Sequence, residues 1–556
     1  MALRNFSVKR IPIPAEMEVR LSDTEDRICK LLDEYVKDTQ PDASTRTICR
    51  IAGGWVRDKL LGSQSNDIDI ALSDTMGFTF AEGLAAYANE KGVATGTISK
   101  IAQNPDQSKH LETATFKVFG LDIDLVNLRS EEYSSDSRIP TGISFGTPLQ
   151  DALRRDITIN ALFYNVHSRE VEDFTGVGRN DLRHGIIRTP LSPRETFLDD
   201  PLRVLRCVRF ASRLGFEIVP EIDAAAKDPK AIVNKVARER VGEEVSKMIK
   251  GRDPLRSIKL IYELSLYDPI FFVIPEASLF TLSGSPTSPS VGLAAASILH
   301  YLLENRAHTL SSNLPILHPL FYRAVDNDPT CSHRLYLAAS LTPYRSITYR
   351  DKKNEDFPLV ELVIRESLKL GKQSHFLDGI PHLFAASNII IPFVAEQDKS
   401  RLSSERVSIG LLLRESSVHK PSTGSHWTSS FLFSLVQELI GHYDAENDAL
   451  NYEQASAVIE KYNKFVERIE SLKLEDASEL KCLLNGPQAI AALTLEGKRK
   501  GPWLGQLLNN ITEWQLKFPE GTKDDCVSWL KEQQQLGLIQ IDDVSEPLNK
   551  RSRAKR

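Results

Sequence analysis

Two aspartates separated by one isoleucine, Asp67 and Asp69, constrain the fold of this chain more than any other feature. From residue 66 to residue 72, charged and apolar side chains alternate, which is the pattern of a strand with one buried face. Because side chains repeat every second residue along a strand, both carboxylates should emerge on the same face. Adjacent carboxylates repel each other unless a cation lies between them, and their hard oxygen atoms suit Mg²⁺. The pattern therefore predicts a magnesium site on a strand.

The segment GGWVRD at residues 53–58 lies shortly upstream and contains Gly53, Gly54 and Arg57. It follows the apolar run 48–52 and precedes a helix-like run, a place where bare backbone N–H groups can approach a phosphate. Alone, a Gly-Gly pair usually marks a turn, and an Asp-x-Asp pattern usually marks the wet face of an edge strand. Together and in this order, the two segments predict a metal-dependent nucleotidyl-transfer site.

Length and composition set limits on the rest of the chain. At 556 residues it is too long for one ordinary core, so we expect roughly two to four modules. Charged residues make up 26% and hydrophobic residues 41%, as in soluble globular proteins. No window approaches the roughly 18 uninterrupted apolar residues of a membrane span, so we expect none. The net charge of −6 gives no overall attraction to nucleic acid, so any RNA contact must depend on local basic patches.

The cysteines and the two termini indicate the compartment only weakly. The six cysteines are scattered without a Cys-x-x-Cys pair, which argues against a standard zinc site and is typical of reduced thiols in a cytosol-like compartment. Residues 1–10 are basic and acid-free; because Pro12 and Pro14 interrupt any amphipathic helix, we expect a disordered leader rather than a mitochondrial presequence. Residues 550–556 carry five positive charges, which fit a nuclear address, an RNA contact or a merely solvated end.

Strand and helix signals divide the chain into two parts. Strand candidates lie at residues 48–52, 67–72, 96–102, 114–119 and 121–128, and residues 79–91 have the composition of a helix. Beyond residue 190 helical periodicity takes over, with polar breaks at residues 283–290 and 401–430. We therefore expect an α+β protein in which a mixed α/β head precedes a mostly helical remainder.

A third acidic ligand should come from a neighbouring strand. The run 121–129 offers Asp122 and Asp124, again on one strand face. We favour Asp124 because it lies deeper in the apolar run, although a half-exposed strand would show the same pattern. Three carboxylates would position two Mg²⁺ ions, one to activate a 3′-hydroxyl and one to hold the leaving diphosphate. Alignment of the reacting oxygens and stabilisation of the developing charge account for most catalysis of this type.

Residues 151–162 predict a binding site for a nucleoside triphosphate. They place Arg154 and Arg155 beside Asp156 and Asn160. Guanidinium groups match phosphate oxygens in geometry, and the two neighbouring polar side chains can bind sugar hydroxyls. By themselves, however, two such arginines would more often form ion pairs on the surface of a helix.

The segment FLDDPLRVLR at residues 197–206 carries the most discriminating chemistry. Pro201 suits a first helical position and Gly215 suits a stop, so we expect a helix of about four turns with Asp200 and Arg203 on one face. Cytosine and adenine each present an amine donor beside a ring-nitrogen acceptor, whereas uracil and guanine present a carbonyl beside an N–H donor. A carboxylate next to a guanidinium therefore accepts C and A and opposes U and G. The alternative is an N-cap aspartate with a surface ion pair.

Two further segments carry structural signals. Residues 173–182 form a glycine-punctuated loop that fits either a hinge between the head and the helices or a plain connecting turn. Residues 238–249 form an amphipathic pattern with charged pairs, and we expect this helix to buttress the one that begins near Pro201.

These segments, in this order from about residue 46 to residue 250, resemble the class II CCA-adding enzymes, which are tRNA nucleotidyltransferases. Residues 53–69 are similar to motif A, 154–161 to motif B, 173–182 to motif C, 199–203 to motif D and 238–249 to motif E, with 109–115 in the flexible-loop region. The set looks most like the fungal branch. Motif D begins with Asp199 where many relatives have Glu, a shortening that could alter the selecting geometry slightly.

The resemblance implies a polymerase-β-like nucleotidyltransferase head with Mg²⁺ as the cofactor. The metal ligands would be Asp67, Asp69 and Asp124. The nucleotide site would contain Gly53, Gly54, Arg57, Arg154, Arg155, Asp156, Asn160, Asp199, Asp200, Arg203 and Arg206. The parts would be an N-terminal extension at 1–45, the head at 46–188, a helical neck at 189–255, a helical body at 256–400 and a helical, tRNA-binding tail at 401–556.

The tail holds two segments, residues 484–487 and 498–505, that are similar to family tail segments. Turn amides and basic side chains there could hold RNA backbone, with Lys498, Arg499 and Lys500 as the contacts. A solvated loop with a buried Trp503 is the alternative.

The resemblance implies an enzyme that adds CCA to tRNA from CTP and ATP without a nucleic-acid template. We expect a monomer that contacts the acceptor end and elbow of tRNA in the cytoplasm, with the nucleus and the mitochondrion as further compartments. Three rivals remain open: an enzyme that adds only CC or only A, a poly(A) polymerase, and a catalytically inactive tRNA-binding scaffold. The scaffold would need a lost carboxylate or a broken phosphate grip, yet Asp67, Asp69, Arg57 and Arg155 are all present.

Overall fold

The head is built on a seven-stranded mixed sheet with the strand order β3-β4-β5-β2-β1-β8-β9. The computed structural model describes residues 10–101, 113–134, 137–227, 236–306, 314–396, 405–444, 449–495 and 501–539. The strands of this sheet are β1 (Cys49–Ala52), β2 (Ile68–Leu72), β3 (Ser99–Ile101), β4 (Thr113–Val118), β5 (Leu121–Asn127), β8 (Phe163–Asn165) and β9 (Glu170–Glu172). The neighbours β2 and β5 run parallel, and the other neighbours run antiparallel. All five predicted strands are confirmed.

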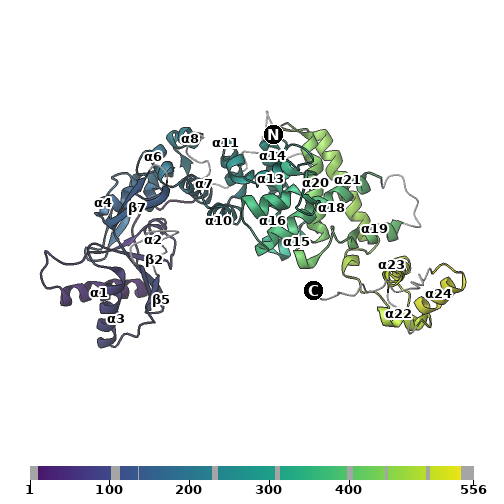
Figure 1. Cartoon of the computed structure of the whole chain (residues 1–556), viewed down its shortest axis with the longest axis horizontal. Helices are drawn as coiled ribbons and strands as arrows, with labels where there is room; N and C mark the ends of the chain where they lie inside the picture. The colour runs from purple at the N-terminus through teal and green to yellow at the C-terminus, as the bar shows by residue number, and fades with distance from the viewer. Residues whose placement is uncertain are drawn as a thin grey trace, which may run out of the picture. The chain divides into compact units, whose positions relative to one another are not determined.

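Helices cover this sheet, and a separate hairpin follows β5. The head helices are α1 (Asp23–Thr39), α2 (Gly54–Leu60), α3 (Gly77–Glu90), α4 (Pro148–Leu153) and α5 (Gly178–His184), and the hairpin is β6 (Arg129–Ser134) with β7 (Ser137–Phe145). The predicted helix at 79–91 is confirmed as α3, which packs against β4 and β5 and also contacts α1 (Figure 1).

A buried ion pair fixes α1 to α2. Glu25 and Lys59 are almost fully buried, and the Lys59 Nζ lies 2.7 Å from a Glu25 carboxylate oxygen. The indole N–H of Trp55 donates to the other oxygen over 3.0 Å. Although α1 falls in the predicted N-terminal extension, it is therefore part of the head's core.

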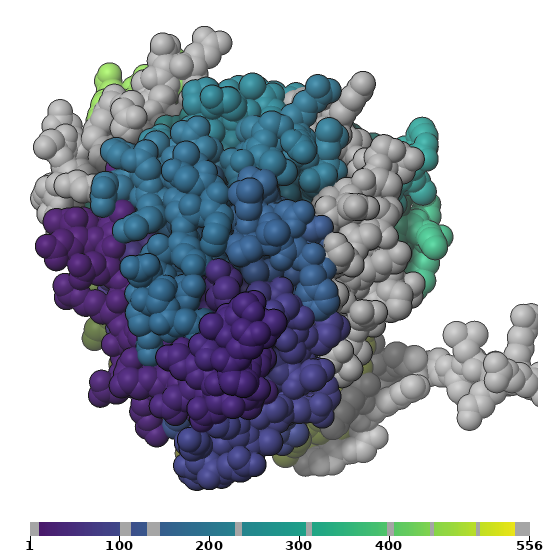
Figure 2. Space-filling model, turned by 90° about the vertical axis from the view of Figure 1, so that its left-hand side faces the viewer, coloured from purple at the N-terminus to yellow at the C-terminus, as the bar shows by residue number. Residues whose placement is uncertain are grey.

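The segment before α1 crosses to the neck. The N–H of Ile11 donates to the carbonyl of Leu214 over 3.1 Å, and the Arg10 guanidinium lies 5.2 Å from the centre of the Phe216 ring. Figure 2 shows the purple N-terminal segments packed directly against the blue segments that include the neck helices. The N-terminal segment thus ties the neck to the head.

The neck is helical, as predicted. Its elements are α6 (Pro193–Asp199), α7 (Leu202–Leu214), α8 (Pro220–Ala226), α10 (Arg238–Ile249) and α11 (Pro254–Glu263), with a short parallel pair of β10 (Ile186–Ile187) and β11 (Glu217–Ile218). Pro201 precedes α7 and Gly215, at φ 71°, ends it, which confirms the predicted helix. The predicted buttress is also confirmed, because α10 packs along α7 and Glu244 accepts a 2.6 Å hydrogen bond from Arg209.

The remainder of the chain is mostly helical. Its helices are α12 (Tyr267–Phe271), α13 (Glu276–Leu279), α14 (Pro289–Glu304), α15 (Arg323–Asn327), α16 (Pro329–Ser340), α17 (Leu359–Leu362), α18 (Phe376–Glu396), α19 (Glu405–Arg414), α20 (Trp427–Leu439), α21 (Tyr452–Ser471), α22 (Gly486–Ala492), α23 (Pro502–Lys517) and α24 (Lys523–Gln535). Short strand pairs interrupt them: β12 (Thr348–Arg350) runs antiparallel to β13 (Asp356–Pro358), and β14 (Tyr443–Asp444) pairs with β15 (Ala449–Leu450). The α+β class with a helical remainder is confirmed.

The chain forms two compact units. The first contains the head and neck, continues through Tyr301, and also includes Ser332–Ile380 and the described residues of Asp444–Ala449. The second contains Leu302–Cys331, Pro381–Tyr443 and the described residues from Leu450 onward. In the second unit α22, α23 and α24 share an apolar core (Figure 1). The finer division into extension, head, neck, body and tail stays a prediction.

One segment has the length and composition of a membrane span. Residues Gln373–Glu396, which include α18, have a mean hydropathy of 1.4, and 44% of the most apolar window is buried in the protein. The buried positions Ile380, Leu383, Ser387, Ile390 and Val394 recur every three or four residues. This spacing is that of a helix packed along one face in a protein core.

Candidate active site

The sheet brings three carboxylates together at one point. Asp69 of β2 lies directly opposite Asp124 of β5 in the parallel register, and Asp67 immediately precedes β2. Each offers an oxygen atom, and these atoms all lie within 4.8 Å of one another. Asp122 is not part of this group, because its side chain is 65% exposed and faces Lys117 at 3.4 Å. The structure therefore selects Asp124 over Asp122 as the third member.

Burial and repulsion within this group raise the pKa of one member. Burial, followed by the charges of Asp67 and Asp124, raises the pKa of Asp69 to about 6, and Arg155 opposes the shift only partly. One pKa unit corresponds to about 1.4 kcal/mol. The protein thus keeps a carboxylate in a place where, without a cation, ionisation is less favourable than for an ordinary aspartate.

The glycine pair allows an arginine to approach the backbone. Gly53 has φ +74°, and a Cβ atom there would lie 2.8 Å from Nη1 of Arg155. The expected role of this glycine, a bare N–H for phosphate, is not what the structure provides: the Gly53 N–H already donates to the carbonyl of Leu162 over 3.0 Å. At Gly54, which begins α2, a Cβ would lie 3.5 Å from Arg57 Nη2. The first glycine therefore makes room for a guanidinium.

A buried aspartate holds the two consecutive arginines of the motif. Asp151 is 1% exposed, and its two oxygens accept hydrogen bonds from Arg154 at 2.5 Å and from Arg155 at 2.9 Å. Burial alone would raise the pKa of Asp151, but Arg155 and Arg154 outweigh it and hold the pKa below its usual value. The arginines form the ion pairs of the alternative interpretation and also line the candidate site.

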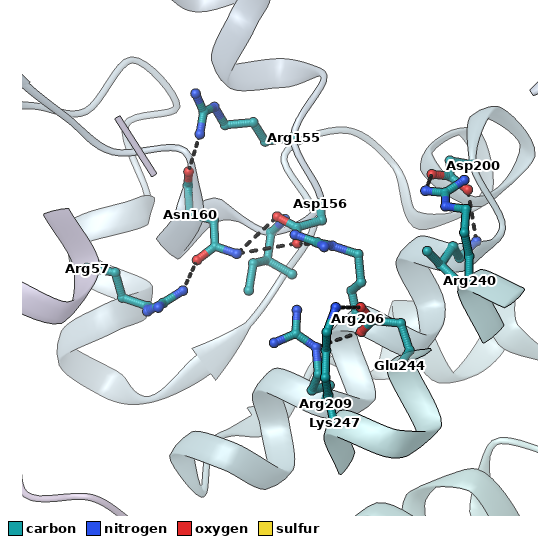
Figure 3. A network of polar contacts seen from close by, with 12 residues as sticks. Arg57, Arg155, Asp156, Asn160, Asp200, Arg206, Arg209, Arg240, Glu244 and Lys247 are labelled. Atoms are coloured by element: carbon teal, nitrogen blue, oxygen red, sulfur yellow. Dashed lines mark hydrogen bonds and ion pairs between the residues drawn. The ribbon is translucent and has the colours of Figure 1, made fainter. Parts of the chain in front are cut away.

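A chain of polar contacts runs from α2 to α7 through the motif B segment (Figure 3). Arg57 donates to the side-chain oxygen of Asn160, whose amide donates to Asp156 over 3.1 Å. Asp156 also accepts from Arg206 of α7 over 2.7 Å. Burial would raise the pKa of Asp156, but Arg206 outweighs that effect and lowers it. One buried carboxylate therefore joins the head to the helix of motif D.

The residues expected to read the base are held by α10 and by the start of α7. Asp200 accepts the N–H of Leu202 over 3.1 Å, which is the capping role of the alternative interpretation. Its ion-pair partner is Arg240 of α10, at 2.9 Å (Figure 3). Arg203 is 7% exposed, and its Nη1 atom is buried without a hydrogen-bond partner among the described residues. An unsatisfied buried donor is costly unless a ligand completes it.

Most of these groups line one cavity of about 820 Å³, and Asp124 and Asp151 lie outside its lining. Its arginines are Arg57, Arg129, Arg154, Arg155, Arg203, Arg206, Arg213 and Arg240, and its aspartates are Asp58, Asp67, Asp69, Asp156 and Asp200. Guanidinium groups outnumber carboxylates, so the cavity suits a polyanion such as a triphosphate. Asp199, predicted for the nucleotide site, is half-buried at the end of α6 and does not line this cavity.

Comparisons with known proteins agree with this geometry. Residues 49–188 match the family model of the poly A polymerase head domain, and residues 215–280 match that of a probable RNA- and SrmB-binding site of polymerase A. The mitochondrial CCA tRNA nucleotidyltransferase of Candida glabrata is 35% identical over 92% of this chain and 96% of its own length. The chain belongs to the CCA tRNA nucleotidyltransferase family. The mitochondrial CCA tRNA nucleotidyltransferase of Saccharomyces cerevisiae is likewise 35% identical, over 92% of this chain and 94% of its own length.

Solved structures of CCA-adding enzymes share the fold of this CCA tRNA nucleotidyltransferase family member. The Thermotoga maritima enzyme complexed with tRNA aligns with a TM-score of 0.55 at 19% identity, over 93% of this chain and 97% of the other. A CCA-adding enzyme complexed with ATP aligns with a TM-score of 0.57 at 19% identity, over 95% and 97%. One complexed with CTP aligns with a TM-score of 0.55 at 19% identity, over 93% and 96%.

Three arginines that line the cavity of this nucleotidyltransferase were not predicted from the sequence: Arg129, Arg213 and Arg240. Arg213 follows Arg206 by seven positions on α7, which places both on one helix face, so helical spacing could have found it. Arg240 lies in the motif E segment, which was assigned only a buttressing role. Arg129 begins β6, directly after the strand that carries Asp124, and no local pattern distinguishes it.

The motif C segment, residues 173–182, is a tight loop that leads into α5. The Asp173 carboxylate accepts from Thr175 Oγ1 over 2.7 Å and from the Arg179 N–H over 2.9 Å. Asp181 accepts from Thr158 Oγ1 over 2.7 Å, which ties α5 to the motif B segment. The hinge interpretation stays a prediction.

The two tail segments each lie at the start of a helix. Asn485 caps α22 by accepting the Gln488 N–H over 3.0 Å, and Gly501 precedes α23. Trp503 is 5% exposed and belongs to the apolar core of α22, α23 and α24, as the alternative interpretation expected. Lys498, Arg499 and Lys500 lie outside the described residues, so their RNA contacts stay a prediction.

Proposed function

We propose that this enzyme adds C, C and A to the 3′ end of tRNA from CTP and ATP, releasing diphosphate and using no nucleic-acid template. One observation carries the proposal: a single cavity joins Asp67 and Asp69 to the pair Asp200 and Arg203 across a lining of arginines. Templated polymerases read a base with another base, whereas here protein groups stand where the base would be read. The relatives named for CCA addition and the related structures with tRNA, ATP and CTP support the same reaction.

The carboxylate group fits divalent cations. Asp67, Asp69 and Asp124 converge within 4.8 Å, and burial together with the charges of Asp67 and Asp124 raises the pKa of Asp69, an effect that a cation would relieve. Oxygen-only ligand sets of this kind suit Mg²⁺. Bound there, a pair of ions would activate the 3′-hydroxyl as a nucleophile and neutralise the charge of the leaving diphosphate.

The arginines hold the triphosphate in line with the attacking hydroxyl. Arg154 and Arg155 are fixed by Asp151, so they present preorganised donors and lose little side-chain entropy on binding. Arg57 is 3% exposed and is held by Asn160, and burial lowers its pKa without removing its charge. These fixed donors stabilise negative charge as it shifts to the diphosphate.

Asp200 and Arg203 choose the base. Arg203 offers its buried, unpartnered Nη1 donor, and Asp200 offers acceptor lone pairs beyond those used by Leu202 and Arg240. Cytosine and adenine satisfy a donor beside an acceptor, whereas uracil and guanine leave buried groups unpaired. Discrimination then comes from the protein's own hydrogen-bonding groups.

The test is an extension assay with purified protein, Mg²⁺ and tRNA transcripts that end before CCA or after CC. Each transcript is supplied with CTP alone, ATP alone or both. Complete CCA addition to the shorter transcript supports the proposal. The control is Asp67→Ala with Asp69→Ala, in which incorporation should fall to background; undiminished incorporation would exclude these carboxylates from catalysis.

The same assay separates the rivals. Addition of only CC, or only A to the CC-ended transcript, would identify a specialised enzyme. Long A tails from ATP alone would identify a poly(A) polymerase, the second candidate favoured by the match to a poly A polymerase head model. No extension of any transcript would leave the inactive tRNA-binding scaffold.

We also propose a mitochondrial location, in addition to the cytoplasm and nucleus, because two relatives covering most of the chain are named as mitochondrial enzymes. Fluorescent tagging at the C-terminus, with a variant lacking residues 1–10, would test the role of the basic N-terminal residues. We further propose that the enzyme acts as a monomer and contacts the acceptor end and elbow of tRNA.

A further inference from the structure

A threonine on the strand next to β5 holds one of the three clustered carboxylates. Thr115 of β4 lies directly opposite Asp124 in the antiparallel register, and its Oγ1 donates to Asp124 Oδ1 over 2.5 Å. Both side chains are half-buried. The side chains of Asp67 and Asp69 accept no hydrogen bond from the described residues. Asp124 is therefore the member of the group whose orientation the protein fixes.

We propose that Thr115 is a positioning residue for the metal site, an inference that rests on the proposed function. A carboxylate turns about its terminal torsion with little hindrance, so its two oxygens exchange places readily. The Thr115 hydroxyl holds Oδ1 and so fixes this torsion for the whole Asp124 carboxylate, which lies beside Asp67 and Asp69. A charge-assisted hydrogen bond of this kind lowers the entropic cost of metal binding, since the ligand is already oriented.

The same two strands contain a second cross-strand contact that does not involve a clustered carboxylate. Two positions along, on the same strand face, Lys117 lies opposite Asp122, and their charged atoms are 3.4 Å apart on an exposed surface. Asp122 is not one of the converging carboxylates. The comparison separates a cross-strand contact that orients a ligand from one that only adds an exposed ion pair, which contributes little.

The experiment measures metal binding directly. Mn²⁺ binding to the purified full-length enzyme is followed by electron paramagnetic resonance, and the rate of CMP incorporation is measured against Mg²⁺ concentration. Thr115→Val removes the donor but keeps the branched shape suited to a strand, whereas Thr115→Ser keeps the donor. Loss of a group that orients a metal ligand typically weakens affinity by about 10- to 100-fold. We expect Thr115→Val to weaken Mn²⁺ binding by about tenfold.

Three further measurements distinguish a positioning role of Thr115 from a purely structural one. The Mg²⁺ concentration for half-maximal rate should rise in Thr115→Val by the same factor as the Mn²⁺ dissociation constant, and the rate should recover at saturating Mg²⁺. Thr115→Ser should remain within about threefold of wild type, and Lys117→Met should not differ from it. In an Asp124→Asn background, Thr115→Val should cause no further loss of Mn²⁺ binding.

Two outcomes would overturn the inference: unchanged Mn²⁺ affinity in Thr115→Val, or an additive loss in the Asp124→Asn background. If Thr115→Val fails to fold by circular dichroism, Thr115→Ala against Thr115→Ser makes the same comparison. If the wild-type enzyme binds Mn²⁺ and extends tRNA, and the Thr115→Val variant does both equally well, only this inference is wrong. If the wild-type enzyme neither binds Mn²⁺ nor extends tRNA, the proposed function itself is wrong.

Discussion

Arg206 of α7 donates its Nε hydrogen to the buried Asp156 carboxylate over 2.7 Å, and this contact joins the motif D helix to the motif B segment. Asp156 also accepts from the amide of Asn160, which holds Arg57. The groups proposed to read the base and those proposed to grip the triphosphate thus share one carboxylate.

Arg206→Met tests this link by leaving Asp156 buried without its counter-charge. Removing one partner of a buried pair costs about 3–5 kcal/mol; because the Arg206 side chain is 36% exposed, we expect about 2 kcal/mol. Arg206 holds the pKa of Asp156 below its unfolded value, so the pair stabilises the fold above that value and loses this effect as pH falls through the lowered pKa. Urea unfolding should therefore show the full difference at pH 7 and a smaller one below about pH 4.

The control is Lys227→Met, which removes an ion pair with Asp223 between two side chains that are each nearly half exposed. Its loss should cost less than about 0.5 kcal/mol at either pH. Equal destabilisation of Arg206→Met at both pH values would mean that packing of the arginine, and not its charge, stabilises the fold.

Base choice should respond to Arg203 and Arg240 in different ways. Arg203→Ala removes the buried donor, so UTP and GTP should compete with CTP and ATP while the fold and tRNA binding persist. An unpaired buried group costs about 1–3 kcal/mol, which corresponds to about a 5- to 150-fold loss of discrimination. Arg240→Met only frees one Asp200 oxygen from an exposed partner, so we expect about a threefold loss. Competition assays with paired nucleotides measure both effects.

Lys247→Met on the same α10 helix serves as the control, because Lys247 is 55% exposed and does not line the cavity. It should leave the CTP-to-UTP ratio unchanged. If Arg203→Ala also leaves the ratio unchanged, the arginine does not read the base. If Arg240→Met changes the ratio more than Arg203→Ala does, the guanidinium of α10 is the main reader.

The alternation of charge at Asp67 and Asp69 was enough to predict a strand, because side-chain period and burial are local properties of sequence. The depth of Asp124 in its apolar run also predicted correctly which acid of β5 would join them. The parallel pairing of β2 with β5, however, depends on a crossover and on contacts distant in sequence. The predicted composition of the site was therefore more complete than its predicted geometry.

The errors and omissions have the same physical origin. Nothing near Gly53 in sequence announces that its N–H is taken by Leu162, since that contact joins segments more than a hundred residues apart. Arg240 lies in a helix whose pattern shows only that one face is buried, and its contact with Asp200 depends on how α10 crosses α7. Asp199 and Asp200 are adjacent in sequence, but only Asp200 lines the cavity because α6 ends between them.

Gly53→Ala should affect both stability and nucleotide binding. Its backbone, at φ 74° and ψ −127°, lies in a region that only glycine occupies readily, and a Cβ would come within 2.8 Å of Arg155 Nη1. Strain of this kind costs about 1–3 kcal/mol. The displaced Arg155 should raise the KM for CTP and ATP together, without a change in base choice. Gly54→Ala, where a Cβ meets Arg57 at 3.5 Å, should have a clearly smaller effect on both. Equal effects of the two substitutions would show that backbone conformation at Gly53 is not the cause.

The clustered carboxylates impose a stability cost that a substitution can reveal. Burial and the charges of Asp67 and Asp124 raise the pKa of Asp69 to about 6, above its unfolded value. For an acid, a raised pKa means that the folded state disfavours the ionised form, so this group destabilises the fold at pH 7. The destabilisation begins to decline as pH falls below about 6 and is lost only below the unfolded pKa of about 4.

Asp69→Asn should therefore abolish nucleotide incorporation yet stabilise the metal-free protein at pH 7, by on the order of 1 kcal/mol after allowance for solvent screening. Differential scanning fluorimetry in a chelator should show a higher melting temperature than wild type at pH 7, a smaller difference at pH 5 and little difference at about pH 4. Saturating Mg²⁺ should reverse the order at pH 7, because the bound cation stabilises the ionised wild-type group and binds the variant weakly. Asp122→Asn, on the same strand but outside the cluster, should not show this pattern. A variant that melts below wild type in chelator at pH 7 would mean that Asp69 is stabilised by contacts with the protein and does not depend on a cation.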